Sequence, residues 1–79
     1  MKSPDDELRT MAECEALAEK SYSDMYDARS PAGFYGEMKD CFIEAIGAAQ
    51  RAGRPDEVKR LTMRLESCKL VYRKQFSGF

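Results

Sequence analysis

Residues 55–76 read PDEVKRLTMRLESCKLVYRKQF, and this stretch decides the fold. Side chains that favour a protein interior recur along it in steps of three, four, three and four, at Val58, Leu61, Leu65, Cys68 and Tyr72. This spacing places them on one face of an α-helix, as in the seam of a heptad repeat. Leu70 and Val71 are expected to widen that face. Because proline is also well suited to the first position of a helix, the segment predicts a helix over residues 55–76.

Two earlier segments carry the same kind of signal. Ser3-Pro4 and Ser30-Pro31 each stand ahead of a run with apolar residues three and four apart. A serine in that place can cap the first turn, and Gly53 allows the left-handed turn that ends the second run. The sequence predicts helices at about 4–28 and 32–52. Gly33 and Gly36 weaken the start of the second helix, so we expect it to become firm only around residues 34–37.

Very short connections join the three expected helices. Such connections force consecutive helices to run antiparallel. The predicted fold class is therefore all-α, a three-helix antiparallel (up-down-up) bundle. We expect one helical-bundle domain over residues 1–79, with residues 77–79 as a frayed tail.

The last two segments resemble one helical hairpin of the tetratricopeptide type. The resemblance rests on Phe42-Ile-Glu-Ala-Ile-Gly-Ala-Ala-Gln-Arg-Ala-Gly53, followed by Arg54-Pro-Asp-Glu-Val-Lys-Arg-Leu61. Small residues lie on its first helix, and a glycine lies in its turn. The resemblance covers about half of the chain, without the tryptophan of the repeat consensus. It implies a style of helix packing rather than membership of that family.

Charge divides along the chain, although the net charge is only −1. Residues 1–40 carry ten acidic and five basic side chains, whereas residues 41–79 carry four acidic and eight basic ones. The first interpretation is that an acidic helix lies beside a basic one, because neighbouring faces of small bundles are commonly complementary. The alternative is a basic surface for an acidic or phosphate-bearing partner.

Nothing in the sequence points to catalysis or to a cofactor. The chain has 79 residues, so we expect no deep catalytic pocket in the monomer, and without a histidine it lacks the usual proton shuttle. Cys14, Cys41 and Cys68 are interpreted mainly as core residues, with a soft metal site or a redox-sensitive thiol as the alternatives. We expect no enzyme activity, no cofactor and no bound metal.

A cytoplasmic location is expected from two features. The number of cysteines is odd, which suits a reducing compartment better than a disulfide scaffold. The acidic start has no apolar stretch of the kind found in a signal peptide, and no run of about 18 apolar residues could cross a membrane.

Aromatic residues gather near the corner between the first two helices, and they suggest a protein-binding site. Tyr22 and Phe34 are expected to cap the core, whereas Tyr26 and Tyr35 are expected outside. Aromatic side chains beside a loose backbone are typical anchors for a protein partner. The sequence therefore predicts a small cytosolic protein–protein interaction or adaptor module, with a possible homodimer, that binds its partner through Tyr26, Phe34 and Tyr35.

A nucleic-acid-associated regulator is the alternative function. It would use the basic face of the third helix, whose positive side chains would meet phosphates. The candidate residues are Lys59, Arg60, Arg64, Arg73 and Lys74. Nucleic acid is nevertheless an unlikely partner by this reasoning, because the total charge is close to neutral and the first helix is acidic.

Overall fold

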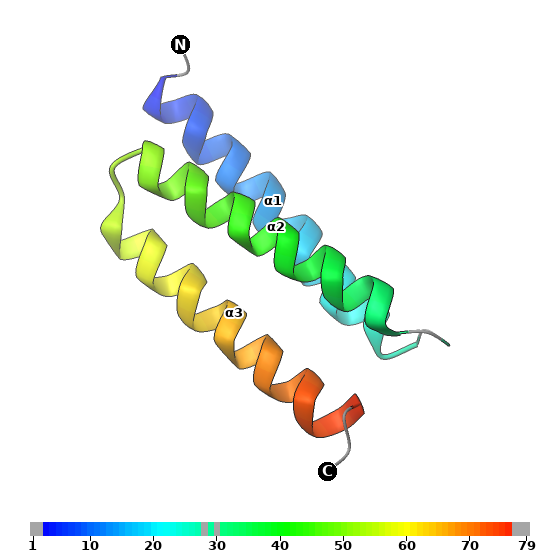
Figure 1. The fold of residues 1–79 in the computed structure, drawn as a ribbon. Helices are drawn as coiled ribbons and strands as arrows, with labels where there is room; N and C mark the ends of the chain where they lie inside the picture. Colours follow the sequence, from blue (N-terminus) through cyan, green and yellow to red (C-terminus); the bar gives the residue numbers. More distant parts are fainter. Residues whose placement is uncertain (1–2, 28, 30, 77–79) are drawn as a thin grey trace.

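The computed structural model describes residues 3–27, 29 and 31–76, and its helices form a three-helix antiparallel bundle. The helices are α1 (Pro4–Met25), α2 (Pro31–Arg51) and α3 (Pro55–Phe76). Figure 1 shows α1 and α3 running in the same direction, with α2 antiparallel to both. Helix α2 packs against each of the other two, and its packing against α1 is the more extensive. The predicted all-α bundle is confirmed.

Helix α1 begins as predicted and ends earlier than predicted. The Asp6 amide donates a hydrogen bond of 3.3 Å to the Ser3 hydroxyl, which is the expected cap ahead of Pro4. At the other end, the amides of Tyr26 and Asp27 bond to carbonyls three residues back, at 3.3 and 3.1 Å. These tight turns close the helix at Met25 rather than near residue 28. Ala28 and Ser30, the expected cap of the next helix, lie outside the described residues.

Helix α2 is regular from Pro31 onward, so the expectation of a late start near residues 34–37 is wrong. Proline has a fixed backbone angle that suits the first helical turn. Gly33 and Gly36 each cost only about 1 kcal/mol relative to alanine, and the rest of the helix outweighs that cost.

Gly53 ends α2 as predicted, with a φ of +70°. The Arg54 amide donates to the Ala49 carbonyl at 3.0 Å, and the Gly53 amide donates to the Gln50 carbonyl at 3.1 Å. This pair of hydrogen bonds is a Schellman motif, which satisfies carbonyls that the helix itself leaves without partners. The chain then enters α3 at Pro55, so the third helix has the predicted bounds.

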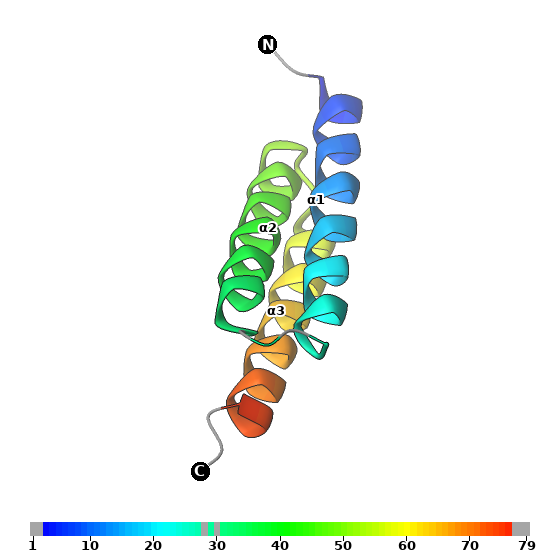
Figure 2. The ribbon, with the colours of Figure 1, turned by 90° about the vertical axis from the view of Figure 1, so that its right-hand side faces the viewer.

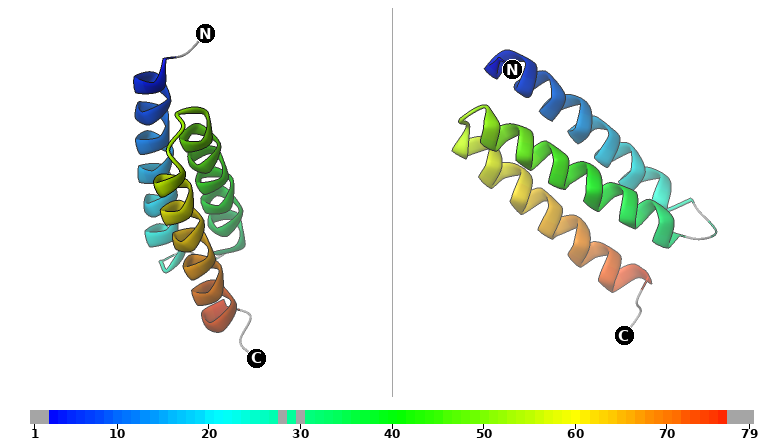
Figure 3. Two further views of the ribbon diagram at one scale, coloured as in Figure 1. Left: turned by 90° about the vertical axis from the view of Figure 1, so that its left-hand side faces the viewer. Right: turned by 45° about the horizontal axis from the view of Figure 1, so that its top comes forward.

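The core runs between the three helices, and among the described residues Phe42 is the aromatic side chain that is fully buried in it. Figures 2 and 3 show the three helices side by side around this interior. The largest fully buried side chains come from all three helices: Phe42, Met25, Met38, Leu61 and Cys68. Ala45, Ala48 and Ala49 of α2 are also fully buried, which lets the neighbouring helices approach closely. The apolar faces expected from the spacing are therefore the faces that pack together.

Candidate interaction surfaces

The acidic first helix lies beside the basic third helix, and two arginines connect them. Arg60 donates hydrogen bonds of 2.6 and 2.9 Å to the carboxylate of Glu15. Arg64 donates hydrogen bonds of 2.7 and 2.8 Å to Glu19. The hydrogen bond from Arg60 lowers the pKa of Glu15, and the same bond raises the pKa of Arg60. The structure thus confirms that the two halves attract each other.

Two of the five cations expected to contact phosphates take part in these ion pairs, and three do not. Arg60 and Arg64 are neutralised within the bundle. Lys59, Arg73 and Lys74 are exposed, and within residues 3–27, 29 and 31–76 they form no ion pair. The basic face of α3 is therefore smaller than the sequence suggests.

The three cysteines differ in burial. Cys68 is fully buried, whereas Cys14 and Cys41 are half-buried. The latter two line a hollow of about 200 Å³ between α1 and α2, together with Leu17, Asp40 and Glu44. In the part of the chain that the structure describes, no three cysteine, aspartate or glutamate side chains are arranged to hold a metal ion.

The cysteine thiols are poorly suited to nucleophilic chemistry. Burial raises the pKa of Cys14, Cys41 and Cys68, and Glu44 raises that of Cys14 further. The Cys14 thiol also donates a weak hydrogen bond of 3.9 Å to Glu44. Because the thiolate is the reactive form, a raised pKa lowers reactivity near neutral pH.

All four tyrosines lie at one end of the bundle, where α1 and α3 end and α2 begins. We call this the aromatic end, and it consists of Tyr22, Tyr26, Phe34, Tyr35 and Tyr72. The Tyr22 and Tyr26 rings meet edge to face, with centroids 5.5 Å apart, and their hydroxyls share a hydrogen bond of 3.0 Å. That hydrogen bond, with burial, raises the pKa of Tyr22 to about 12. The guanidinium of Arg64 lies 5.1 Å from the centre of the Tyr22 ring.

Tyr35 is not on the outside, which corrects the expectation for this residue. Its ring stacks on Tyr72 of α3, with centroids 3.8 Å apart and planes within 4° of parallel. The amine of Lys39 lies 4.5 Å from the centre of the Tyr35 ring. Tyr22 and Tyr35 therefore cap the core, while Phe34 is half-buried and Tyr26 is 47 % exposed.

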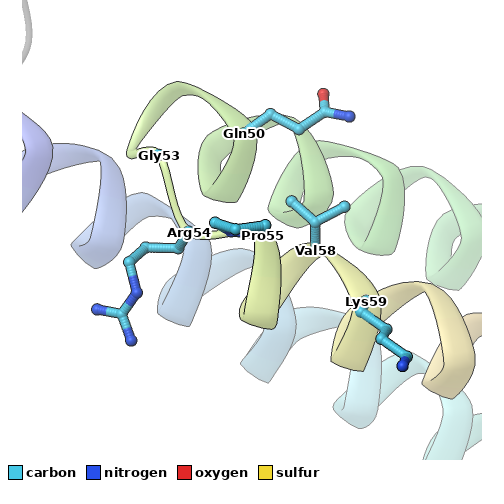
Figure 4. A pocket seen from close by; sticks show the side chains of 6 residues that line it. All are labelled: Gln50, Gly53, Arg54, Pro55, Val58 and Lys59. Atoms are coloured by element: carbon cyan, nitrogen blue, oxygen red, sulfur yellow. The ribbon is translucent and has the colours of Figure 1, made fainter.

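Sequence reasoning missed an apolar hollow at the turn between α2 and α3. It has a volume of about 400 Å³ and is lined by Gln50, Gly53, Arg54, Pro55, Val58 and Lys59. Figure 4 shows Val58 and Pro55 facing Gln50, whereas the Arg54 side chain extends away from Val58. Arg54 is held there by Asp56, at 3.1 and 3.2 Å. The available signal was the pair of apolar residues, Pro55 and Val58, directly after a glycine turn.

Leu70 was expected to widen the buried face of α3, and the structure places it outside. It is 49 % exposed, and Met63, one heptad earlier, is 61 % exposed. Residues seven apart lie on nearly the same side of a helix. Both side chains therefore belong to the face of α3 that points away from the core.

Comparison of the chain with models of known protein families, with curated proteins and with solved structures gives no match. Among the described residues, no helix has both the length and the apolar character needed to cross a bilayer.

Proposed function

We propose that this chain is a protein-interaction module whose partner docks on the aromatic end. One observation carries the proposal: every tyrosine of the chain lies at that end, and Tyr26 keeps 47 % of its surface exposed there. Tyrosine and tryptophan are the residues most often found at the energetic centres of protein interfaces.

The ring contacts support a docking role because they hold the aromatic side chains in place before binding. Tyr26 is fixed by its edge-to-face contact and hydrogen bond with Tyr22. Tyr35 is fixed by its stack on Tyr72. A side chain that is already ordered loses little conformational entropy when a partner arrives. The end thus offers both apolar rings and hydroxyl groups on a partly exposed surface.

Nucleic-acid binding by α3 has less support. Arg60 and Arg64 stand at the centre of the candidate basic face, and both are bound to carboxylates of α1. A phosphate would have to displace those carboxylates. A gel-shift series at low and high salt distinguishes the two functions, because binding through phosphate contacts weakens as salt rises.

The test compares Tyr26→Ala with the unaltered chain in capture from a cell lysate. Tyr26→Ala should abolish capture of a specific partner, because truncating a central aromatic anchor typically costs about 2 kcal/mol or more. Ile43→Ala is the matched control, since Ile43 is also exposed, at 59 %, but lies in the middle of α2. Thermal unfolding of each variant shows that the fold is intact.

Equal capture by Tyr26→Ala and the unaltered chain would mean that the partner does not bind at the aromatic end. The mass of the chain in solution, measured by light scattering, adds a second result. A dimer that dissociates on Tyr26→Ala would mean that the partner at this end is a second copy of the chain.

A further inference from the structure

The outward face of α3 carries a second heptad pattern. We define this outer face as Lys59, Met63, Glu66, Leu70, Arg73 and Lys74, all of which are exposed. The first five follow one another in steps of four, three, four and three. That spacing is the one along which a second helix can lie on the first. Met63 and Leu70 supply the apolar contacts, with 61 and 49 % of their surfaces exposed.

Charge on this face is positive, and the residues that the structure describes do not compensate it. Lys59, Arg73 and Lys74 form no ion pair with any residue that the structure describes. The acid on the face, Glu66, is already offset by Lys69, whose amine lies 3.4 Å from its carboxylate. The outer face therefore presents two apolar side chains between unpaired cations.

The hollow at the α2–α3 turn extends this surface at its N-terminal end. Lys59 belongs to both the hollow and the outer face, and Figure 4 shows it one position along α3 from Val58. Val58 and Pro55 give the hollow an apolar lining. An apolar side chain at the end of a docked helix would bind in this hollow.

We propose that the outer face of α3 binds an acidic amphipathic helix of a partner protein. The heptad spacing accommodates a helix, and Met63 and Leu70 meet its apolar stripe. Lys59 comes before these two residues along α3, and Arg73 and Lys74 come after them, so the cations meet carboxylates toward the two ends of the partner helix. This surface belongs to α3, whereas Tyr26 follows the end of α1; Arg73 and Lys74 of the outer face come directly after Tyr72 of the aromatic end. The chain would then join two partners, one at the aromatic end and one along α3.

The probe is a synthetic helical peptide about three heptads long, with leucine at the first and fourth positions and glutamate at the flanking positions. Its binding to the full chain is measured by calorimetry. A second peptide has glutamine in place of glutamate. The chain should bind the glutamate peptide more tightly, and raising the salt from about 0.05 to about 0.5 M should weaken that binding several-fold.

The combined substitution Met63→Glu with Leu70→Glu should weaken binding at least about tenfold, because it removes the apolar contacts and adds like charge. Leu17→Glu with Ile43→Glu is the matched control, since these side chains are 56 and 59 % exposed on the other two helices. It should bind as the unaltered chain does. Tyr26→Ala should also keep the binding, which separates this proposal from the one for the aromatic end.

Charge reversal at Lys59, Arg73 and Lys74 tests the electrostatic part of the proposal. These three changes together should abolish the preference for the glutamate peptide over the glutamine peptide. An unchanged preference would contradict the assignment of the cations, because nothing else on the outer face would attract carboxylates.

Three results would overturn the proposal. The first is no binding of the glutamate peptide at about 0.1 mM, the weak end of specific association. The second is binding to vesicles of anionic lipid with no binding to the peptide, which would assign the face to a membrane surface. The third is a dimeric mass in solution that falls to that of a monomer on Met63→Glu with Leu70→Glu, which would mean that a second copy covers the face.

Discussion

The turn between α2 and α3 depends on one backbone angle, the φ of Gly53. Its φ of +70° lies in the left-handed region, where a side chain brings its Cβ too close to the backbone. A Cβ added there would meet no other atom within 4 Å, so the surroundings place no limit on this residue. Glycine is required by the conformation alone. Gly33 differs, because it lies inside α2 with ordinary helical geometry and equally open surroundings.

This contrast predicts opposite effects of the same substitution. Gly53→Ala should lower the free energy of unfolding by about 1 kcal/mol, through left-handed strain. Gly33→Ala should raise it by about 0.5 kcal/mol, because alanine loses less conformational entropy on entering a helix. Urea titration of both variants measures the two changes. Two changes of the same sign would mean that the backbone angle does not determine the effect.

At the scale of the elements, long charged side chains connect α1 and α3. Their backbones have few close approaches, whereas each packs on α2. The two bidentate arginine–glutamate pairs lie between them. The pairs are partly exposed, so each contributes only about 0.5–1 kcal/mol. Both pairs form together in the observed register, because Glu15 and Glu19 have the same four-residue spacing as Arg60 and Arg64.

The Glu15–Arg60 pair predicts how stability depends on pH. Arg60 lowers the pKa of Glu15 in the folded chain below the usual value of 4.5. A lowered folded pKa gives stability that is present above 4.5 and is lost as the pH falls through the folded pKa. Glu15→Gln should therefore unfold more easily than the unaltered chain at pH 7, by about 0.5–1 kcal/mol, and this difference should shrink below pH 4.5.

Glu13→Gln is the control for this measurement. Glu13 is exposed on α1 and forms no ion pair with the described residues. Its substitution should change stability little at either pH. Thermal unfolding at a series of pH values gives all three curves. A Glu15→Gln difference that persists undiminished in acid would show that the ion pair is not its source.

The helices could be predicted because their signals are local. The apolar spacing of residues 55–76, the Ser3 cap and the Gly53 stop all lie within a few residues of the boundaries they determine. The end of α1 was placed too late because it was predicted from Pro31, whereas the helix ends at Met25, where no proline or glycine stands. Two short-range hydrogen bonds close it instead.

Contacts between distant residues could not be predicted in the same way. Tyr35 stacks on Tyr72, and this contact depends on the level at which α2 and α3 meet rather than on either helix alone. Glu7 illustrates the same limit. It lies in the first turn of α1, where an acid is favoured by the helix dipole alone, yet it is only 5 % exposed and accepts a hydrogen bond of 2.8 Å from Arg51. The spacing of residues determines which face is apolar, and only the assembled bundle determines which side chains meet.

As a whole molecule, the bundle is small and therefore has little stability to lose. Chains of this size unfold at a cost of roughly 4–12 kcal/mol. Around Phe42, the core is formed largely by alanine, methionine and leucine side chains. A core with so few large side chains depends strongly on each one.

The core thus predicts that alanine substitutions at two neighbouring residues have very different effects on stability. Phe42→Ala should destabilise the chain by about 3–5 kcal/mol, because Phe42 is fully buried and its loss leaves a cavity. Ile43→Ala, at a side chain 59 % exposed, should change stability by less than about 0.5 kcal/mol. Circular dichroism during heating measures both. A mild effect of Phe42→Ala would mean that the helices close in to fill the space.

The gathering of the tyrosines has an optical consequence. The chain has four tyrosines and no tryptophan, so its near-ultraviolet fluorescence originates almost entirely from the aromatic end. The opposite end, with the turn between α2 and α3, has no tyrosine and therefore contributes almost nothing to this emission. A ligand that settles over Tyr26 would therefore alter the emitted light without any attached dye, whereas one lying beyond the range of the rings would leave it unchanged.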